Sequence, residues 1–317
     1  MNLMRSALLA ASESAWLREH APRVGFVRRA VGRFMPGERL EDAMAAAAGL
    51  QRAGLGTVFT HLGENVTDIT QADAVARDYL GVLQRLREAG LDTEISVKLT
   101  HFGLDIDRER CHANLRALVD AARAVGNYVW IDMEQHPYVD ATLDLYRRAR
   151  EEFPNVGVCL QAYLHRTPAD LAALVPLGPG IRLVKGAYRE PASVAHPQKR
   201  DVDASYLALA KTMLGPEATR SGLRAVFGTH DLAIISTINQ HATGAGLDAS
   251  RVEYHLLYGI QQLEQRRLVT AGHRVRVLIS YGDFWFPWYM RRLAERPANV
   301  WFVVKNVLDT GRDRRRG

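Results

Sequence analysis

Two adjacent arginines near the C-terminus, Arg291 and Arg292, carry the clearest chemical signal in the sequence. They stand in WYMRRLAERPANV (288–300), a stretch typical of a helix start, and Glu295 follows within one turn of Arg292. Neighbouring helical side chains point in different directions, so a ligand that both arginines bind must lie across the helix. The planar guanidinium binds carboxylates bidentately and stays charged. The pair predicts a small-carboxylate site, and the aromatic run before it predicts an apolar lid; an ordinary solvated helix face is the alternative.

A second group of polar side chains stands where apolar runs end. In chain order it comprises His61, Glu64, Lys98, Thr100, Asp132, Glu134, Gln161, Arg182, Lys185, Thr229, His230, Asp231, Tyr254 and His255. Burying such groups without partners would be costly. A structural salt bridge is an equal alternative for any one of them, but not for the whole set, so the set predicts a functional site.

Eight short β-branched or aromatic runs must position these residues, and most are separated by helical patterns. They cover 57–62, 94–100, 128–133, 156–162, 181–186, 224–229, 251–257 and 274–280. This order predicts an α/β fold, a (β/α)8 barrel, in which the chemistry lies at the carboxyl ends of the strands. Helices are expected within residues 1–54, and 189–203 is expected to be a loose excursion. A doubly wound open sheet is the alternative, but HLGEN after the first run is not a glycine-rich turn.

The motifs argue against metal and nucleophile chemistry. The residue two after His61 is Gly63, so HxH is missing, and neither HExxH nor GxSxG occurs. We therefore expect no metal. What remains is a basic, aromatic-rich pocket that suits a large planar anionic cofactor and a small anionic substrate.

Composition is that of an ordinary globular protein: 317 residues, 47% hydrophobic and 24% charged. The net charge of +6 owes much to the C-terminal GRDRRRG, so we expect one catalytic domain over 1–307, a basic, disordered tail over 308–317, and no nucleic-acid binding. Only Cys111 and Cys159 are present, which favours the reducing cytoplasm. No apolar run is long enough to span a bilayer, although the tail leaves open peripheral contact with the inner face of the membrane.

Several segments together resemble the bacterial monofunctional proline dehydrogenase family. They are ISVKLTHFGLD, VWIDMEQHP, LQAYLHRTPADL, IRLVKGAYREP, FGTHD, YHLLYGIQ and YMRRLAERPANV. The resemblance implies a distorted (β/α)8 barrel with extra N-terminal helices and a C-terminal lid helix. It also implies FAD bound without a dinucleotide fingerprint, oxidation of L-proline to Δ1-pyrroline-5-carboxylate as the first step of proline catabolism, and electron transfer to a membrane quinone.

The same resemblance implies roles for individual residues. Asp132 and Arg182 are expected to be catalytic, with Arg182 close to flavin N5 and Asp132 beside Lys98. The substrate is expected to contact Lys98, Tyr188, Leu278, Trp288, Arg291 and Arg292, with Glu295 holding the arginine pair in place. The expected FAD contacts are Gln161, Arg182, Val184, Lys185, Gly186, Ala187, Tyr188, Arg189, Thr229 and His230.

Three positions depart from the family's pattern. The chain has Leu278, Ile279 and Ser280 where the family has YVP, Trp288 where a tyrosine is usual, and His255 where a glutamine is usual. A smaller apolar wall at Leu278 should weaken selection against larger substrates, whereas Trp288 adds bulk. The substrate alternative is therefore a modified cyclic imino acid, such as hydroxyproline, methylproline or a biosynthetic intermediate. The sequence also leaves open a flavin-binding protein without turnover and a folate-linked flavin barrel reductase.

Overall fold

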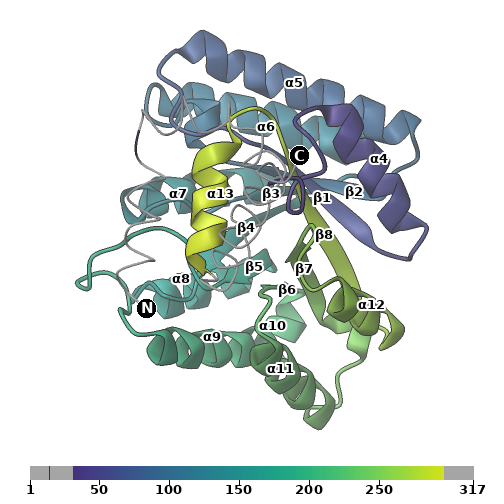
Figure 1. The fold of residues 1–317 in the computed structure, drawn as a ribbon. Helices are drawn as coiled ribbons and strands as arrows, with labels where there is room; N and C mark the ends of the chain where they lie inside the picture. The colour runs from purple at the N-terminus through teal and green to yellow at the C-terminus, as the bar shows by residue number, and fades with distance from the viewer. Residues whose placement is uncertain (1–13, 15–30, 296–317) are drawn as a thin grey trace, which may run out of the picture.

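Eight parallel strands close into a barrel, and helices surround it (Figure 1). The structure, a computed structural model, describes Ser14 and residues 31–295, without the side chains of 291, 292, 294 and 295. The strands are β1 (Gly56–His61), β2 (Thr93–Val97), β3 (Val129–Ile131), β4 (Val156–Gln161), β5 (Gly180–Val184), β6 (Arg224–Gly228), β7 (Glu253–Leu257) and β8 (Arg274–Tyr281). Each strand pairs with the next, and β8 closes on β1. The predicted (β/α)8 barrel is confirmed, and the open-sheet alternative is wrong.

Helix α4 precedes β1, and the other helices follow the strands in the order expected for such a barrel. They are α4 (Leu40–Gln51), α5 (Ile69–Glu88), α6 (Arg108–Ala124), α7 (Val139–Glu152), α8 (Thr167–Leu174), α9 (Lys199–Met213), α10 (Pro216–Ser221), α11 (Leu232–Gly244), α12 (Gln262–Thr270) and α13 (Trp285–Glu295). Among the described residues, no helix is long and apolar enough to cross a membrane. The helices expected before residue 31 and the tail over 308–317 lie outside the described residues.

Two sequence predictions of local structure need correction. The run 94–100 contains a strand only to Val97, because the N–H of Thr100 donates to Glu134 Oε1 (3.1 Å) and Thr100 begins a short 3-10 turn. The stretch 189–203 is not wholly loose, since α9 already begins at Lys199. The side chains of Lys199 and Asp203, one helical turn apart, form an ion pair that supports this first turn.

Side chains along each strand alternate between the barrel interior and the helical layer. On β2, Ile95 and Val97 belong to the large core under the helices, so Glu94 and Ser96 face inward. A second, small apolar cluster of Val58, Trp130 and Val226 lies inside the barrel, with Leu278 packed against it. The interior is thus apolar only in its middle, and polar side chains occupy both ends.

Helix α13 lies over the strands in the view of Figure 1. Its apolar residues pack with Val31, Phe34 and Met35 and with Leu62, which directly follows β1. The helix is therefore held at the carboxyl end of β1, where a lid over the barrel is expected.

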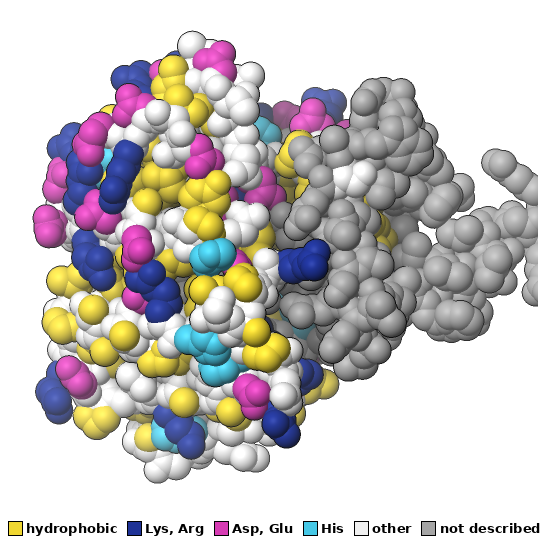
Figure 2. All heavy atoms as spheres, turned by 90° about the vertical axis from the view of Figure 1, so that its left-hand side faces the viewer, with side chains coloured by type: hydrophobic (Ala, Val, Ile, Leu, Met, Phe, Trp, Pro, Cys, Tyr) yellow, Lys and Arg dark blue, Asp and Glu magenta, His cyan; other side chains and the backbone are white. Residues whose placement is uncertain are grey.

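Charge on the outer surface is mixed. Figure 2 shows acidic and basic side chains interspersed over one face of the molecule. The described residues drawn there form a surface of both signs rather than a continuous basic one.

Candidate active site

Arg182 on β5 is the centre of the polar upper interior. Its side chain is 3% exposed, and its Nη2 donates to Ser96 Oγ (2.9 Å) and forms an ion pair with Asp132 Oδ1. Ser96 Oγ in turn donates to Asp132 Oδ1 at 3.1 Å. The three residues come from β5, β2 and the end of β3, so the closed barrel brings them together. Pairing with Asp132 offsets the cost of burying the guanidinium.

On β4 and β5, two buried polar atoms have no hydrogen-bond partner within the described part of the chain. They are Arg182 Nη1, a donor, and Gln161 Oε1, an acceptor. Gln161 is oriented by its own Nε2, which donates to the carbonyl of Met133 at 3.3 Å. Buried groups of this kind normally have a partner. A flavin ring edge offers both acceptors and an N–H donor, so the residues present fit that group.

Lys98 follows β2 on the inward-facing side and is half-buried. Its ammonium makes neither a hydrogen bond nor an ion pair with the residues that the structure describes. Asp132, predicted to stand beside it, directs its carboxylate to Arg182 instead. A partially buried cation without a counter-ion favours an anionic ligand at this point.

Lys185, a predicted cofactor contact, belongs to a ring of four charges. Its Nζ lies 2.5 Å from Asp203 Oδ1 and 2.9 Å from Asp231 Oδ2, and Lys199 pairs with the same two carboxylates. Against the opposing effect of burial, hydrogen bonds from Lys185 and Lys199 lower the pKa of Asp231 to about 2. The ring ties the loop after β5 to α9 and to the start of α11. The roles of Lys199 and Asp203 were missed, although their spacing of four residues was a usable signal.

The loop that follows Lys185 needs a glycine. Gly186 has φ of +113°, and a Cβ there would lie 2.4 Å from the ring of Tyr163. Of the other predicted contacts in this loop, Val184 and Ala187 are half-buried and Arg189 is exposed. Tyr188 is 9% exposed. The loop thus brings its backbone close to the barrel, where it could approach a cofactor.

Two further predicted cofactor contacts, Thr229 and His230, follow β6. Thr229 Oγ1 accepts from the N–H of Asp231 (3.2 Å), and His230 Nε2 accepts from the N–H of Leu257 at the end of β7 (2.9 Å). Both side chains are therefore held in place by backbone groups of the same rim.

Neutral groups occupy the opposite side of the rim. The ring of His61 is stacked on Tyr281 at 5.1 Å and meets His101 edge-on at 5.6 Å. Burial lowers the pKa of both histidines, that of His101 to about 3. Burial also raises the pKa of Glu134 to about 7. The positive charge of this upper interior therefore comes from Lys98 and Arg182 rather than from the histidines.

Two of the predicted pocket residues, Leu278 and Trp288, belong to different apolar clusters. Leu278 is half-buried and packs on the interior cluster that contains Trp130. Trp288 is 7% exposed within the cluster that holds α13. Arg291 and Arg292 lie in α13, but their side chains are outside the described residues.

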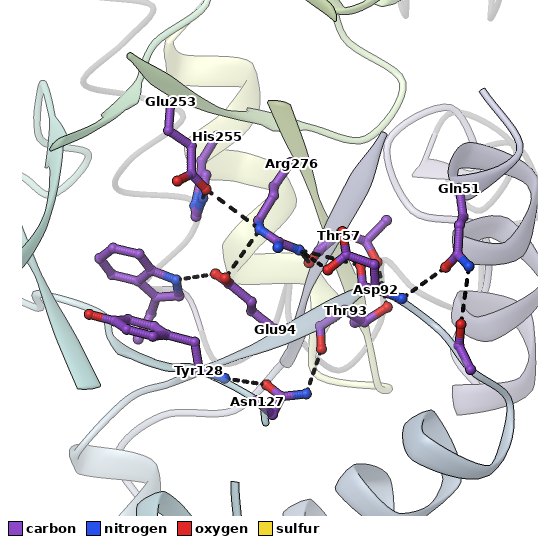
Figure 3. A network of polar contacts seen from close by, with 12 residues as sticks. Gln51, Thr57, Asp92, Thr93, Glu94, Asn127, Tyr128, Glu253, His255 and Arg276 are labelled. Atoms are coloured by element: carbon purple, nitrogen blue, oxygen red, sulfur yellow. Dashed lines mark hydrogen bonds and ion pairs between the residues drawn. The ribbon is translucent and has the colours of Figure 1, made fainter. Parts of the chain in front are cut away.

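A cluster of four charges, which sequence reasoning missed, lies at the opposite end of the interior. This lower charge cluster comprises Glu94, Arg224, Glu253 and Arg276. Figure 3 shows Glu94, Glu253 and Arg276 with the ion pairs between them. Arg224 reaches Glu94 at 2.8 Å and Glu253 at 2.6 Å, and Arg276 lies 3.2 Å and 3.5 Å from the same carboxylates.

His255 belongs to this lower end rather than to the rim. Its Nε2 lies 2.9 Å from Glu253 Oε1, and burial lowers its pKa to about 3. Ligand atoms of Glu94, Glu253 and His255 lie within 4.8 Å of one another. Because two arginines already pair with these carboxylates, we assign the group no metal ion.

Comparison with known proteins adds a family to this geometry. A family model described as proline dehydrogenase matches residues 43–305. The chain is 38% identical over 306 residues to proline dehydrogenase 1 of Bacillus subtilis subsp. natto, covering 96% of this chain and 99% of that protein. It is 36% identical over 281 residues to the proline dehydrogenase of Deinococcus radiodurans, covering 87% and 89%.

A solved structure with the same fold belongs to a much longer protein. Proline utilization A from Bdellovibrio bacteriovorus, inactivated by N-propargylglycine, is similar with a TM-score of 0.76 and 21% identity. The match covers 84% of this chain and 32% of that chain, so the present chain spans about a third of it. At this identity the similarity concerns the fold.

Proposed function

Since the chain belongs to the proline dehydrogenase family, we propose that it oxidises L-proline to Δ1-pyrroline-5-carboxylate with FAD at the carboxyl ends of the barrel strands. It is an oxidoreductase that acts on a CH–NH group, in proline catabolism. One observation carries the placement of FAD: Arg182 Nη1 and Gln161 Oε1, on the neighbouring strands β5 and β4, are both buried and have no partner among the described residues. Such a pair would hold the flavin ring.

The protein's own residues would bind and orient the reactants. Bound FAD would accept the hydride that leaves the carbon next to the ring nitrogen of proline. Lys98, whose ammonium is otherwise unpaired among the described residues, would attract the substrate carboxylate together with Arg291 and Arg292. Asp132 and Ser96 hold the Arg182 guanidinium in one orientation, so it need not reorganise during the reaction. Helix α13 would cover the site and exclude water.

A modified cyclic imino acid is the alternative substrate. Leu278 packs against the apolar cluster inside the barrel and is only half-buried, so part of its side chain is open to contact with a ligand. An apolar wall of this size rejects an added hydroxyl or methyl group only weakly. This observation keeps hydroxyproline and methylproline as candidates.

Anaerobic titration of the FAD-loaded protein tests both substrates. L-proline should bleach the visible flavin band at lower concentration than trans-4-hydroxy-L-proline does. Bleaching by the substituted compound alone would replace proline as the substrate, and a flavin that stays oxidised with every imino acid would refute the proposal.

The variant Leu278→Tyr tests the role of the wall. It should increase the preference for L-proline over the substituted compound several-fold, because the larger side chain narrows the interior. Leu278→Met is the matched control, since it keeps the apolar character and nearly the volume. An unchanged ratio of half-bleaching concentrations in Leu278→Tyr would contradict this role.

For the electron acceptor we propose a quinone, with peripheral membrane contact through the four arginines of GRDRRRG (311–317). The support is the family resemblance and the charge of that segment. Proline-reduced protein should reduce a soluble quinone, and it should sediment with anionic vesicles at low salt. Loss of sedimentation on deleting 308–317 would be expected, and unchanged sedimentation would refute the tail's role.

A further inference from the structure

Trp130 connects the two charged ends of the barrel interior. The side chain is fully buried, and its ring centre lies 5.2 Å from the guanidinium carbon of Arg182 and 5.2 Å from that of Arg224. Its indole Nε1 donates to Glu94 Oε2 at 2.6 Å. A single aromatic side chain thus touches Arg182 above and the lower charge cluster below.

Two glycines make room for this arrangement. Trp130 is level with Gly157 on β4, Gly157 with Gly180 on β5, and Gly180 with Arg224 on β6. A Cβ at Gly157 would lie 2.6 Å from the Trp130 ring, and one at Gly180 would lie 2.1 Å from the hydroxyl of Tyr128. Because β4 and β5 carry no side chain at this level, the rings of Trp130 on β3 and of Tyr128 just before it reach Arg224.

The contacts leave Arg182 little freedom. Ser96 and Asp132 hold its Nη2, while the indole ring lies beside the guanidinium. A desolvated cation next to a tryptophan ring is favourably placed. The amino group that remains, Nη1, is the buried donor without a partner among the residues described. The position of the indole therefore helps to decide where Nη1 points.

We propose that Trp130 is a positioning residue for Arg182, and that Glu94 of the lower charge cluster anchors the indole ring for this purpose. The inference rests on the proposed function only in taking the flavin as the ligand of Arg182. It gives the lower charge cluster a role at the opposite end of the barrel. Removing the indole should loosen the guanidinium and admit water beneath it, which weakens its stabilisation of negative charge on reduced flavin.

The decisive measurement is the reduction potential of bound FAD, obtained by dye-linked enzymatic reduction without proline. For Trp130→Leu we expect the equilibrium constant for reduction of the bound FAD to fall about tenfold. This corresponds to a reduction potential about 30 mV lower for two electrons. Tyr128→Leu is the matched control. The Tyr128 ring lies 4.6 Å from the Arg224 guanidinium carbon and 5.1 Å from the Trp130 ring, so this variant disturbs the same layer, yet among the described residues Tyr128 does not contact Arg182. Its potential should stay at the wild-type value.

Trp130→Phe keeps a ring but loses the hydrogen bond to Glu94. If Trp130→Leu does not fold, the reduction potential is measured on Trp130→Phe instead. For this variant we expect the equilibrium constant for reduction of FAD to fall about threefold, which lowers the reduction potential by roughly 15 mV. A wild-type potential in the Trp130 variant that folds, or an equal decrease in Tyr128→Leu, would overturn the positioning role.

A ligand-free crystal structure of Trp130→Phe gives a readout that needs no cofactor. The separation of Arg182 Nη2 from Ser96 Oγ, 2.9 Å in the native chain, should increase. An unchanged separation would argue against the inference even if the protein bound no FAD. Failure of the proposed function would appear separately, as wild-type flavin that no imino acid reduces.

Discussion

Replacing Glu134 by glutamine should stabilise the protein at pH 8 and change its stability much less at pH 5. The Glu134 side chain is fully buried, and its two oxygens accept from the N–H of Thr100 (3.1 Å) and from Thr100 Oγ1 (2.5 Å). Burial outweighs these hydrogen bonds and raises the carboxyl pKa from 4.5 to about 7. Glutamine can keep both contacts, because its oxygen accepts from the N–H and its amide donates to the hydroxyl.

The size and sign of the effect follow from proton linkage. A pKa that rises from 4.5 to about 7 corresponds to about 3 kcal/mol, at roughly 1.4 kcal/mol for each pH unit. The unfolded chain releases the proton near pH 4.5, whereas the folded protein keeps it to about pH 7. The free energy of unfolding therefore falls as the pH rises between these values, and it is constant above them. The glutamine variant lacks this loss.

Urea denaturation of both proteins at pH 5, 6, 7 and 8 measures the difference directly. Titrations of other groups cancel when the two proteins are compared at one pH. Glu264→Gln is the matched control, because a hydrogen bond from Arg267 lowers the pKa of Glu264 and its titration lies below this pH range. A difference between Glu134→Gln and the native protein that does not change from pH 5 to 8 would refute the reasoning.

Two other substitutions test the interior and the rim. Gly157→Ala should lower the free energy of unfolding by about 1–3 kcal/mol, since its Cβ would lie 2.6 Å from the Trp130 ring. Thermal denaturation measures this change, and a variant as stable as the native protein would contradict the close packing of Gly157 against Trp130. Asp231→Asn should cost about 1 kcal/mol at pH 7, because it removes the charge that Lys185 and Lys199 share. The contribution of the Asp231 ion pairs to the free energy of unfolding should diminish as the pH falls from 3.8 towards about 2. At pH 7 the difference in free energy of unfolding between the native protein and Asp231→Asn, measured with urea, should become smaller in 1 M salt. A difference that does not change with salt would exclude the ionic explanation.

The barrel itself was predictable because its signal is local. Apolar runs of strand length, alternating with helical patterns, need no knowledge of distant contacts, and all eight coincide with observed strands. The ends of the strands were less predictable. Thr100 is β-branched and follows an apolar run, yet its N–H is bound by Glu134 from the next strand's end. A contact of this kind depends on the tertiary fold.

The pairing inside the barrel was not predictable from the sequence. Asp132 could reach Lys98 or Arg182, and only the stagger of the closed barrel selects Arg182 two strands away. The lower charge cluster was missed for the same reason, since Glu94, Arg224, Glu253 and Arg276 are scattered over 183 positions of the chain, counted inclusively. The alternation of side chains predicts that such residues share one face of a strand, but not which strand lies opposite.

Strand β2 and the residue after it explain why the chemistry lies at the carboxyl end of the barrel. Inward-facing positions carry Glu94, Ser96 and Lys98 in turn. Glu94 is neutralised by two arginines at the lower end, and Ser96 is hydrogen-bonded in the middle. Lys98 has no counter-ion within the described residues. Buried charge that is already paired gains little from a ligand, whereas an unpaired cation beside a buried arginine gains a partner when an anion binds. The same strand thus closes one end of the barrel with internal ion pairs and leaves the other end ready for an anionic ligand.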